Sequence, residues 1–384
     1  MKLKRRITVT TGTRAEYGIL RPILKKIMTS KKLELCLIVT GMHLSTKHGM
    51  TINEITKDNF KISAKIKMMP EDDSTFFMSK TLGEGIIQFS KVFKKLKPDI
   101  NLVLGDRDES LASTIAAYHM NIPNAHIHGG DKTKAGIDEY NRHAITKMSN
   151  IHFVATKKSR ERVLRMGEKL KYVYLTGSPS IDEVKNDQIT RKKELENKYN
   201  IHFTGEEILL LQHPVTTEIE KTEKDIQNIL DAIVKIGKTT IAIAPNSDTG
   251  NNIIFKYLKT YSKKHTFIKS YSTFPRADFL GMLKNCGVLV GNSSSGMVEA
   301  SCFKIPIVNI GIRQEGRERG NNVFNIENPN TKTLQKMIQN ILKIDHGNFS
   351  TINNYGNGTA SKKITHHLET IKLVKELIQK QITY

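Results

Sequence analysis

The segment Gly291-Asn292-Ser293-Ser294-Ser295-Gly296 carries the clearest chemical signal in this chain of 384 residues. It follows the apolar run 288–290 and leads into a helical stretch, so it joins a strand to a helix. Small residues expose backbone N–H groups at a helix N-terminus and hydroxyls add donors, which suits a diphosphate. Glu299, one turn further on, is placed to accept hydrogen bonds from ribose hydroxyls. The alternative, an ordinary turn of small residues, is disfavoured by the length and position of the segment.

Two arginine-bearing turns suit the same kind of ligand. Arg14 follows Gly12 after the first apolar run, and it fits a phosphate or carboxylate unless it is a surface residue in an ordinary turn. The loop 311–320 carries three arginines between glycines. Arg313 in this loop fits a phosphate or a substrate oxyanion better than a solvated position.

Acidic residues follow two further expected strands. Asp106 comes after the run 100–104, where a general acid or base and a cap of the next helix are equally compatible with its position. Asp138 and Glu139 lie in the first turn of an expected helix. By themselves these two acids are explained by compensation of the helix dipole.

Histidines also lie at strand ends. His126 and His128 point to the same side of a strand that precedes Gly129-Gly130-Asp131. Because the His-x-His-x-x-Asp spacing is loose for a metal site, we expect a polar cleft lining and no metal. His213 stands before Pro214 at the end of another strand, and a catalytic role and a structural role are equally compatible with that position.

These residues must be positioned by a chain that alternates short apolar runs with longer amphipathic ones. Alternating strands and helices predict parallel sheets covered on both faces. Two such series predict an α/β protein with two Rossmann-like domains, 1–180 and 181–361, and a C-terminal helix within 362–384 that packs back on the first domain. Ligands of such sheets bind beyond the carboxyl ends of the strands, so we expect the site in the cleft between the domains. The expected strands are 7–10, 33–40, 100–104, 122–127, 151–155, 172–175, 208–211, 239–244, 266–269, 288–290 and 307–310.

Composition narrows the class of protein. Sixty Lys and Arg against 38 Asp and Glu give a net charge of +22, which favours anionic partners. The lysines are scattered through helical stretches without interleaved aromatics, so we expect no nucleic-acid partner. No apolar run approaches the ~20 residues of a membrane helix, and the three cysteines form no CxxC pair. These features predict a cytoplasmic protein without a membrane partner.

Taken in order, the motifs resemble those of the hydrolysing UDP-N-acetylglucosamine 2-epimerases of sialic-acid-type pathways. The resemblance spans residues 6–325, and the run 142–147 and the triple serine separate it from the non-hydrolysing relatives. The motifs are Gly12-Thr13-Arg14-Ala15-Glu16, Thr40-Gly41-Met42-His43-Leu44, Gly105-Asp106-Arg107, His126-Ile127-His128-Gly129-Gly130-Asp131, Asp138-Glu139, Arg142-His143-Ala144-Ile145-Thr146-Lys147, Gly291-Asn292-Ser293-Ser294-Ser295-Gly296 and Asn309-Ile310-Gly311-Ile312-Arg313.

The resemblance implies a GT-B-type architecture that binds a UDP-sugar, homodimers or homotetramers, and no cofactor such as a nicotinamide. The implied reaction converts UDP-N-acetylglucosamine and water to N-acetylmannosamine and UDP. It proceeds by removal of the C2 proton, loss of UDP and hydration of a glucal. Alternatives are the same reaction on a 4-acetamido-6-deoxy sugar nucleotide of legionaminic acid synthesis, a GT-B glycosyltransferase, and a non-catalytic sugar-nucleotide sensor.

The resemblance also implies roles for individual residues. Phosphates would be held by Arg14, Arg313 and Ser293–Ser295, and the ribose by Glu299, while Asp106, Asp138 and His213 would line the reacting sugar. His128 stands where the non-hydrolysing relatives have Glu, and Asp131 where hydrolysing relatives often carry Glu. The identity of the C2 base therefore stays open, as does the choice between Asp138 and Glu139. The remaining substrate-binding residues of the implied set are His43, Arg107, Arg142, Asn292, Ser294 and Gly296.

Overall fold

The computed structural model describes residues 4–72, 74–134, 136–186, 189–246, 248–350 and 354–383. The chain forms two compact units. The first contains residues 1–132, 138–186 and 354–384, and the second contains residues 133–137 and 187–353. In the described ranges no helix is both long and apolar enough to cross a membrane.

Within the described residues, the first unit holds a seven-stranded sheet in the order β3-β2-β1-β4-β5-β6-β7. Each neighbouring pair of strands is parallel. The strands are β1 (Arg5–Thr11), β2 (Leu33–Thr40), β3 (Ile62–Ile66), β4 (Ile100–Leu104), β5 (Asn124–Ile127), β6 (Ile151–Val154) and β7 (Val173–Leu175).

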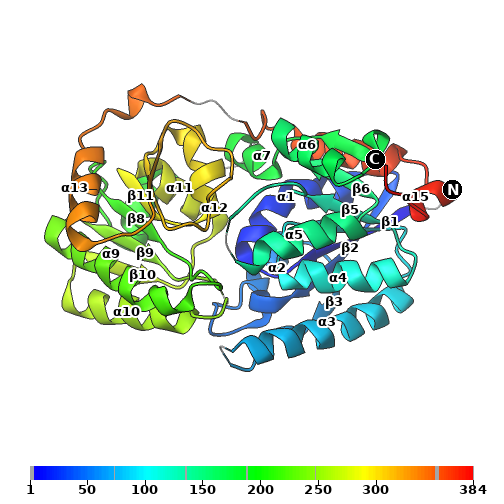
Figure 1. Ribbon diagram of the computed structural model, residues 1–384, viewed down its shortest axis with the longest axis horizontal. Coiled ribbons are helices and arrows are strands. Elements are labelled where there is room, and N and C mark those ends of the chain that lie inside the picture. The colour runs from blue at the N-terminus through cyan, green and yellow to red at the C-terminus, as the bar shows by residue number, and fades with distance from the viewer. Residues whose placement is uncertain are drawn as a thin grey trace. The chain divides into compact units, whose positions relative to one another are not determined.

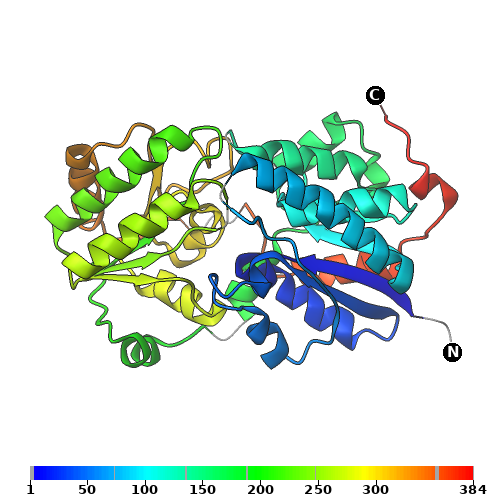
Figure 2. The same ribbon diagram turned by 90° about the horizontal axis from the view of Figure 1, so that it is seen from below.

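Helices cover both faces of this sheet, as a buried parallel sheet requires. One face packs against α1 and α14, and the other against α3 and α4. Figure 2 shows the blue α1 on one side of the blue strands and the cyan helices on the other. The helices of this unit are α1 (Arg14–Thr29), α2 (Ile52–Lys57), α3 (Thr75–Leu96), α4 (Asp108–His119), α5 (Ile137–Met148), α6 (Lys157–Arg165), α7 (Pro179–Asn186), α14 (Ala360–Thr370) and α15 (Lys375–Ile378).

The second unit has, among its described residues, a six-stranded sheet in the order β10-β9-β8-β11-β12-β13 with parallel neighbours. Most of its strands and helices carry labels in Figure 1. The strands are β8 (Ile208–Leu211), β9 (Thr240–Ile243), β10 (Ile268–Tyr271), β11 (Val288–Gly291), β12 (Ile307–Ile310) and β13 (Val323–Ile326). The helices are α8 (Lys192–Tyr199), α9 (Thr222–Ile236), α10 (Asn251–Lys264), α11 (Arg276–Asn285), α12 (Ser294–Val298) and α13 (Thr331–Ile341).

The two faces of this second sheet bury different residues of the same strands. Leu210 of β8 packs in one core with apolar residues of α9, α10 and α13. Its neighbours Leu209 and Leu211 lie in a second core with residues of α8 and α11. The continuous apolar run 208–211 therefore marks a strand buried on both sides, as the sequence predicts for a parallel sheet.

Three elements differ from the expectations. Strands β3 and β13 were not expected, because their residues are mostly half-buried at the sheet edges and lack a continuous apolar run. The prediction of a single helix after residue 362 is wrong, because α14 ends at Thr370 and only the short α15 follows. The Arg5 side chain donates to the carbonyl oxygens of Leu368 and Ile371, which satisfies backbone acceptors where α14 ends.

Candidate functional site

The turn after β1 is built around the buried carboxyl of Glu16. The Glu16 Oε2 atom accepts hydrogen bonds from the backbone N–H groups of Gly12 and Thr13, each at 3.0 Å, and the Thr13 hydroxyl accepts from the Glu16 N–H. This reciprocal capping box starts α1. Burial, and then the nearby Glu109 carboxylate, raises the pKa of Glu16 to about 8. Glu16 is therefore protonated at neutral pH.

Two glycines make room for Glu109 at the same strand edge. A Cβ atom on Gly12 or on Gly41 would lie within 2.7 Å of the Glu109 carboxyl group. Gly41 also has a positive φ of 56°, which a side chain would strain. Arg107 Nε donates to Glu109 Oε2 at 3.3 Å. Arg107 and two acids thus converge at the carboxyl ends of β1 and β4.

Arg14 and His43 are both engaged by protein groups. Arg14 Nε donates to Glu54 Oε2 on α2 at 2.8 Å. The His43 ring has no exposed surface, and its nitrogens lie 3.0 Å from the Thr11 hydroxyl and 2.7 Å from the Thr51 hydroxyl. Burial lowers the pKa of His43 to about 4, so this histidine is neutral at pH 7. The predicted ligand contacts of both residues stay predictions.

Arg142 on α5 gathers the acids that follow β4 and begin α5. Its guanidinium donates to Asp106 from two nitrogens, Nε at 2.9 Å, and to Glu139 Oε2 at 2.6 Å. Burial alone would lower the pKa of Arg142. The nearby carboxylates, led by Asp106, outweigh burial, so the pKa of Arg142 lies above its ordinary value. His143 Nε2 lies 3.0 Å from the second Glu139 oxygen. Arg142 is 1% exposed, and its fixed charge favours the ionised forms of both acids.

The loop after β5 places His128 and Asp131 in direct contact. His128 Nδ1 lies 2.9 Å from Asp131 Oδ2, and His128 Nε2 lies 2.9 Å from the hydroxyl of Ser178, which follows β7. The second Asp131 oxygen accepts from the Ser159 hydroxyl at 2.8 Å. His126, by contrast, is a buried core residue bonded to the Gly105 carbonyl oxygen, and burial lowers its pKa to about 3. Asp138 lies half-buried in the first turn of α5.

In the second unit, Asn292 connects the ends of β8 and β11. Its side-chain Oδ1 accepts from the His213 N–H at 2.8 Å, and its Nδ2 donates to the His213 carbonyl oxygen at 2.9 Å. The Asn292 carbonyl oxygen accepts from Arg313 Nη1 at 3.2 Å and from Gln314 Nε2 at 2.9 Å. One buried asparagine therefore positions three strand-end loops.

The serine segment forms the expected strand-to-helix turn. Ser293 caps the five-residue α12 by accepting from the Ser295 N–H, and the two hydroxyls lie 2.9 Å apart. Ser294 and Ser295 are partly exposed, whereas Gly296 is buried. Gly291 has a φ of 132°, and a Cβ atom there would lie 2.1 Å from the Leu211 carbonyl oxygen, so only glycine fits.

Glu299 lies at the end of α12 and is 3% exposed. One of its oxygens accepts from Arg276 of α11. The other, Oε2, has no hydrogen-bond partner among the described residues. A buried carboxylate oxygen without a donor is ready to accept one from a bound hydroxyl group.

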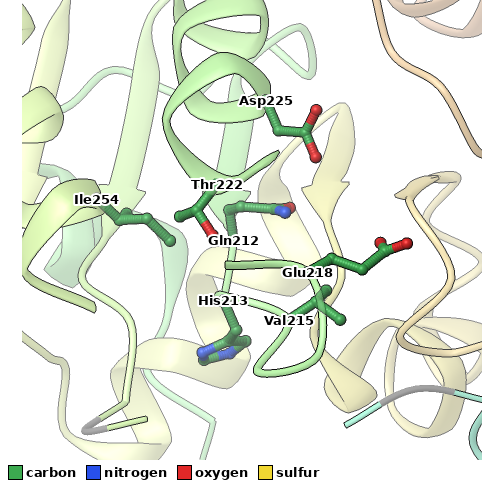
Figure 3. Close-up of a pocket in the computed structure, with 7 residues that line it drawn as sticks. All are labelled: Gln212, His213, Val215, Glu218, Thr222, Asp225 and Ile254. Carbon is green, nitrogen blue, oxygen red and sulfur yellow. The ribbon is translucent and has the colours of Figure 1, made fainter. Parts of the chain in front are cut away.

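His213 also lines a small pocket at the start of α9, shown in Figure 3. The His213 Nδ1 atom accepts from the Asn246 N–H at 3.3 Å, so the imidazole is oriented by the loop after β9. The pocket is lined by Gln212, His213, Val215, Glu218, Thr222, Asp225 and Ile254.

The structure thus brings the predicted residues together in two groups, one on each unit. In the first unit, Asp106, Glu139 and Arg142 share one ion cluster, and His128 and Asp131 share one hydrogen bond. In the second unit, Asn292 contacts His213 and Arg313. No cluster of three or more His, Cys, Asp or Glu side chains arranged to hold a metal is found in the described ranges. Sequence reasoning assigned no role to Glu16 and Glu109, and it missed Ser159, Ser178, Arg276 and Gln314. Ser159 and Arg276 lie in helices, so no strand-end position marked them.

The two parallel sheets with covered faces define the protein as a two-domain α/β protein of the GT-B type, as predicted. A crystal structure of UDP-GlcNAc 2-epimerase from Neisseria meningitidis bound to UDP-GlcNAc matches with a TM-score of 0.79 at 19% identity, covering 94% of this chain and 99% of that one. The Methanocaldococcus jannaschii UDP-GlcNAc 2-epimerase in complex with UDP-GlcNAc and UDP also matches with a TM-score of 0.79, at 21% identity and with the same coverage.

The sequence comparisons identify the family. The family model for UDP-N-acetylglucosamine 2-epimerase matches residues 25–369, and the chain belongs to that family. The UDP-N,N'-diacetylbacillosamine 2-epimerase (hydrolyzing) of Legionella pneumophila is 36% identical, covering 99% of this chain and 100% of the relative. The UDP-N-acetylglucosamine 2-epimerase of Neisseria meningitidis serogroup B is 31% identical, covering 96% and 95%. The predicted resemblance to hydrolysing 2-epimerases is confirmed.

Proposed function

We propose that this protein is a hydrolysing 2-epimerase that converts UDP-N,N'-diacetylbacillosamine and water to UDP and the free 2-epimeric sugar, 2,4-diacetamido-2,4,6-trideoxymannose. The similarity to the Legionella pneumophila relative over 99% of this chain carries the choice of substrate. A Campylobacter jejuni GDP/UDP-N,N'-diacetylbacillosamine 2-epimerase (hydrolyzing), 35% identical over 84% of the chain, supports the same choice. UDP-N-acetylglucosamine, giving N-acetylmannosamine, is the second candidate because of the Neisseria meningitidis relative.

The first chemical step needs a base at C2 of the sugar, and Asp106 is our first candidate. Its carboxylate is one-fifth exposed and is held by Arg142, so it is both accessible and fixed in orientation. A carboxylate anchored in this way accepts a weakly acidic C–H proton only when the substrate is closely positioned. Asp138, at the start of α5, is the second candidate for this role.

The C2–H electron pair forms a C1=C2 double bond as the C1–O bond breaks, and UDP leaves with the pair of electrons from that bond. In the proposal, Arg313 and the serine segment hold the diphosphate, and Glu299 Oε2 accepts from a ribose hydroxyl. Water then adds across the double bond. Its hydroxyl goes to C1 and a proton goes to C2 from the opposite face, so the free sugar is epimerised. His213 stabilises the departing diphosphate or transfers a proton.

Two measurements test this function. The purified protein is incubated with each sugar nucleotide in turn, and the free sugar is identified by mass spectrometry and NMR. We expect turnover of UDP-N,N'-diacetylbacillosamine to exceed that of UDP-N-acetylglucosamine. Turnover in D2O must place deuterium at C2 of the product, and its absence excludes proton abstraction at C2. A sugar transferred to an acceptor would instead indicate a glycosyltransferase, and UDP binding without turnover a sensor.

We propose a cytoplasmic homodimer or homotetramer that uses no cofactor and binds neither nucleic acid nor membrane. Light scattering of the purified protein measures the oligomeric state.

A further inference from the structure

His128 stands at the centre of a chain of buried hydrogen bonds that joins two loops of the first unit. Asp131 lies on its Nδ1 side and Ser178 on its Nε2 side, each at 2.9 Å. The three residues are 8%, 3% and 1% exposed, respectively. Ser178 comes from the loop after β7, 50 residues further along the chain, so the contact exists only because of the fold.

One set of bond directions follows when Asp131 is ionised and the His128 ring is neutral. An ionised Asp131 only accepts, so His128 must carry its proton on Nδ1. The neutral imidazole then has its lone pair on Nε2 and accepts from the Ser178 hydroxyl. Because the Ser178 hydroxyl donates its hydrogen bond to His128, its oxygen accepts one from the Ser180 hydroxyl at 2.8 Å. The chain is consistent with one tautomer of His128.

Asp131 is saturated by protein groups. Its Oδ2 accepts from His128, its Oδ1 accepts from Ser159, and its carbonyl oxygen accepts from Arg142 Nη1 at 3.1 Å. A base at C2 of a sugar needs a carboxylate oxygen that the substrate can reach. With both oxygens engaged and 3% of the residue exposed, Asp131 is arranged to hold other groups.

The backbone supports the same interpretation. His128 has a φ of 68°, in the left-handed region that is uncommon for residues other than glycine. Strained backbone persists where surrounding contacts enforce it, and it is frequent at functional sites. Here Ser178 is fixed in turn, because its own N–H donates to the Tyr355 carbonyl oxygen at 2.6 Å. Both ends of the His128 ring are thus held by residues that are themselves immobilised.

We propose that Ser178, His128 and Asp131 are positioning residues for Arg142 and, through it, for Asp106. This inference rests on the proposed 2-epimerase reaction. The links run from the Ser178 hydroxyl to His128, from His128 to Asp131, from the Asp131 carbonyl oxygen to Arg142, and from Arg142 to Asp106. Asp131 contributes by holding this chain and does not itself remove the C2 proton.

The test combines kinetics with NMR of the histidine rings. Ser178→Ala and Asp131→Asn are compared with Thr176→Val, which removes a buried hydroxyl two residues from Ser178 that bonds only to backbone carbonyls. We expect each of the first two variants to lower kcat ~10–100-fold with KM changed less than threefold, by analogy with other residues that orient a reacting group. Thr176→Val should keep wild-type kinetics. Ser178→Thr, which keeps a hydroxyl, should recover part of the activity.

The double variant Ser178→Ala/Asp131→Asn separates a shared role from two independent ones. If both residues act through His128, the double variant is no slower than the slower single variant, because one chain has already been broken. Multiplied losses would overturn the proposal. So would a complete loss of deuterium incorporation at C2 in Asp131→Asn together with wild-type activity in Ser178→Ala, because Asp131 would then be the base.

Ring 15N spectra of the full-length protein give a readout independent of turnover. The His128 signals are assigned among the 13 histidines with the variant His128→Gln. We expect the Nδ1–H tautomer in the wild type and a switch towards Nε2–H in Asp131→Asn, since loss of the orienting acid changes the tautomer. An Nε2–H tautomer in the wild type overturns the proposal. If neither sugar nucleotide is turned over, the proposed function fails, and the ring signals still decide whether Asp131 sets the His128 tautomer.

Discussion

The buried Glu16 predicts an unusual dependence of stability on pH. Its pKa is raised to about 8 by burial and by Glu109, whereas the ordinary value in an unfolded chain is near 4.5. Below pH 4.5 the carboxyl is protonated in both states, so it has no effect on the folding equilibrium. Between pH 4.5 and about 8 the native state keeps a proton that the unfolded state has lost. The stability of the first unit therefore falls as pH rises through this window, and the fall ends above it.

The substitution Glu16→Gln removes this titration while keeping the size of the side chain. Its amide oxygen can still accept from the N–H groups of Gly12 and Thr13. The slope for one proton is ~1.4 kcal/mol per pH unit, so the full window gives an upper bound of about 5 kcal/mol. Relaxation and water near an ionised Glu16 reduce this cost, and we expect the variant to be ~2–4 kcal/mol more stable than the wild type at pH 8. Near pH 4.5 the two proteins should differ little.

The measurement is urea unfolding between pH 4.5 and 8.5 with hydrogen–deuterium exchange of the peptide that covers β1 and α1. This readout isolates the first unit, whose opening free energy those amides report. Glu34→Gln is the matched control, because this β2 carboxyl is half exposed and should give parallel curves within ~0.5 kcal/mol. Parallel curves for Glu16→Gln and wild type, or a less stable variant at pH 8, would refute the assignment of a protonated Glu16.

Three further substitutions test the site itself. Arg142→Lys keeps the positive charge but loses the two guanidinium hydrogen bonds to Asp106. We expect initial-rate measurements to show kcat lowered ~100-fold. An unchanged kcat would contradict the role of the ion cluster in holding the base. Asn292→Ala leaves the backbone groups of His213 without their side-chain partners, so it should lower the free energy of unfolding in urea by ~2–4 kcal/mol. It should also weaken UDP binding measured by calorimetry. Glu299→Gln should weaken UDP binding ~10-fold but change the affinity for 2′,3′-dideoxy-UDP less than twofold; equal losses for both nucleotides would argue against a ribose contact.

The sequence by itself determined the architecture. Apolar runs such as 208–211 and 288–290 marked strands buried on both faces, and the helical stretches between them required parallel sheets in two series. The serine segment was recognisable because its small residues and the helix that follows them are local properties. The edge strands β3 and β13 were missed because strand prediction relied on continuous apolar runs. Their half-buried residues give no such run.

Only the tertiary structure decided which side chains act together. Arg142 and Asp106 lie 36 residues apart, His128 and Ser178 lie 50 apart, and Asn292 and His213 lie 79 apart. Local periodicity carries no information about such pairs, because they depend on which strands become neighbours in the sheet. Burial was equally inaccessible, although it keeps Glu16 protonated and saturates Asp131. Residue types along the chain named most of the candidate groups, and the fold assigned their partners, their ionisation and their accessibility.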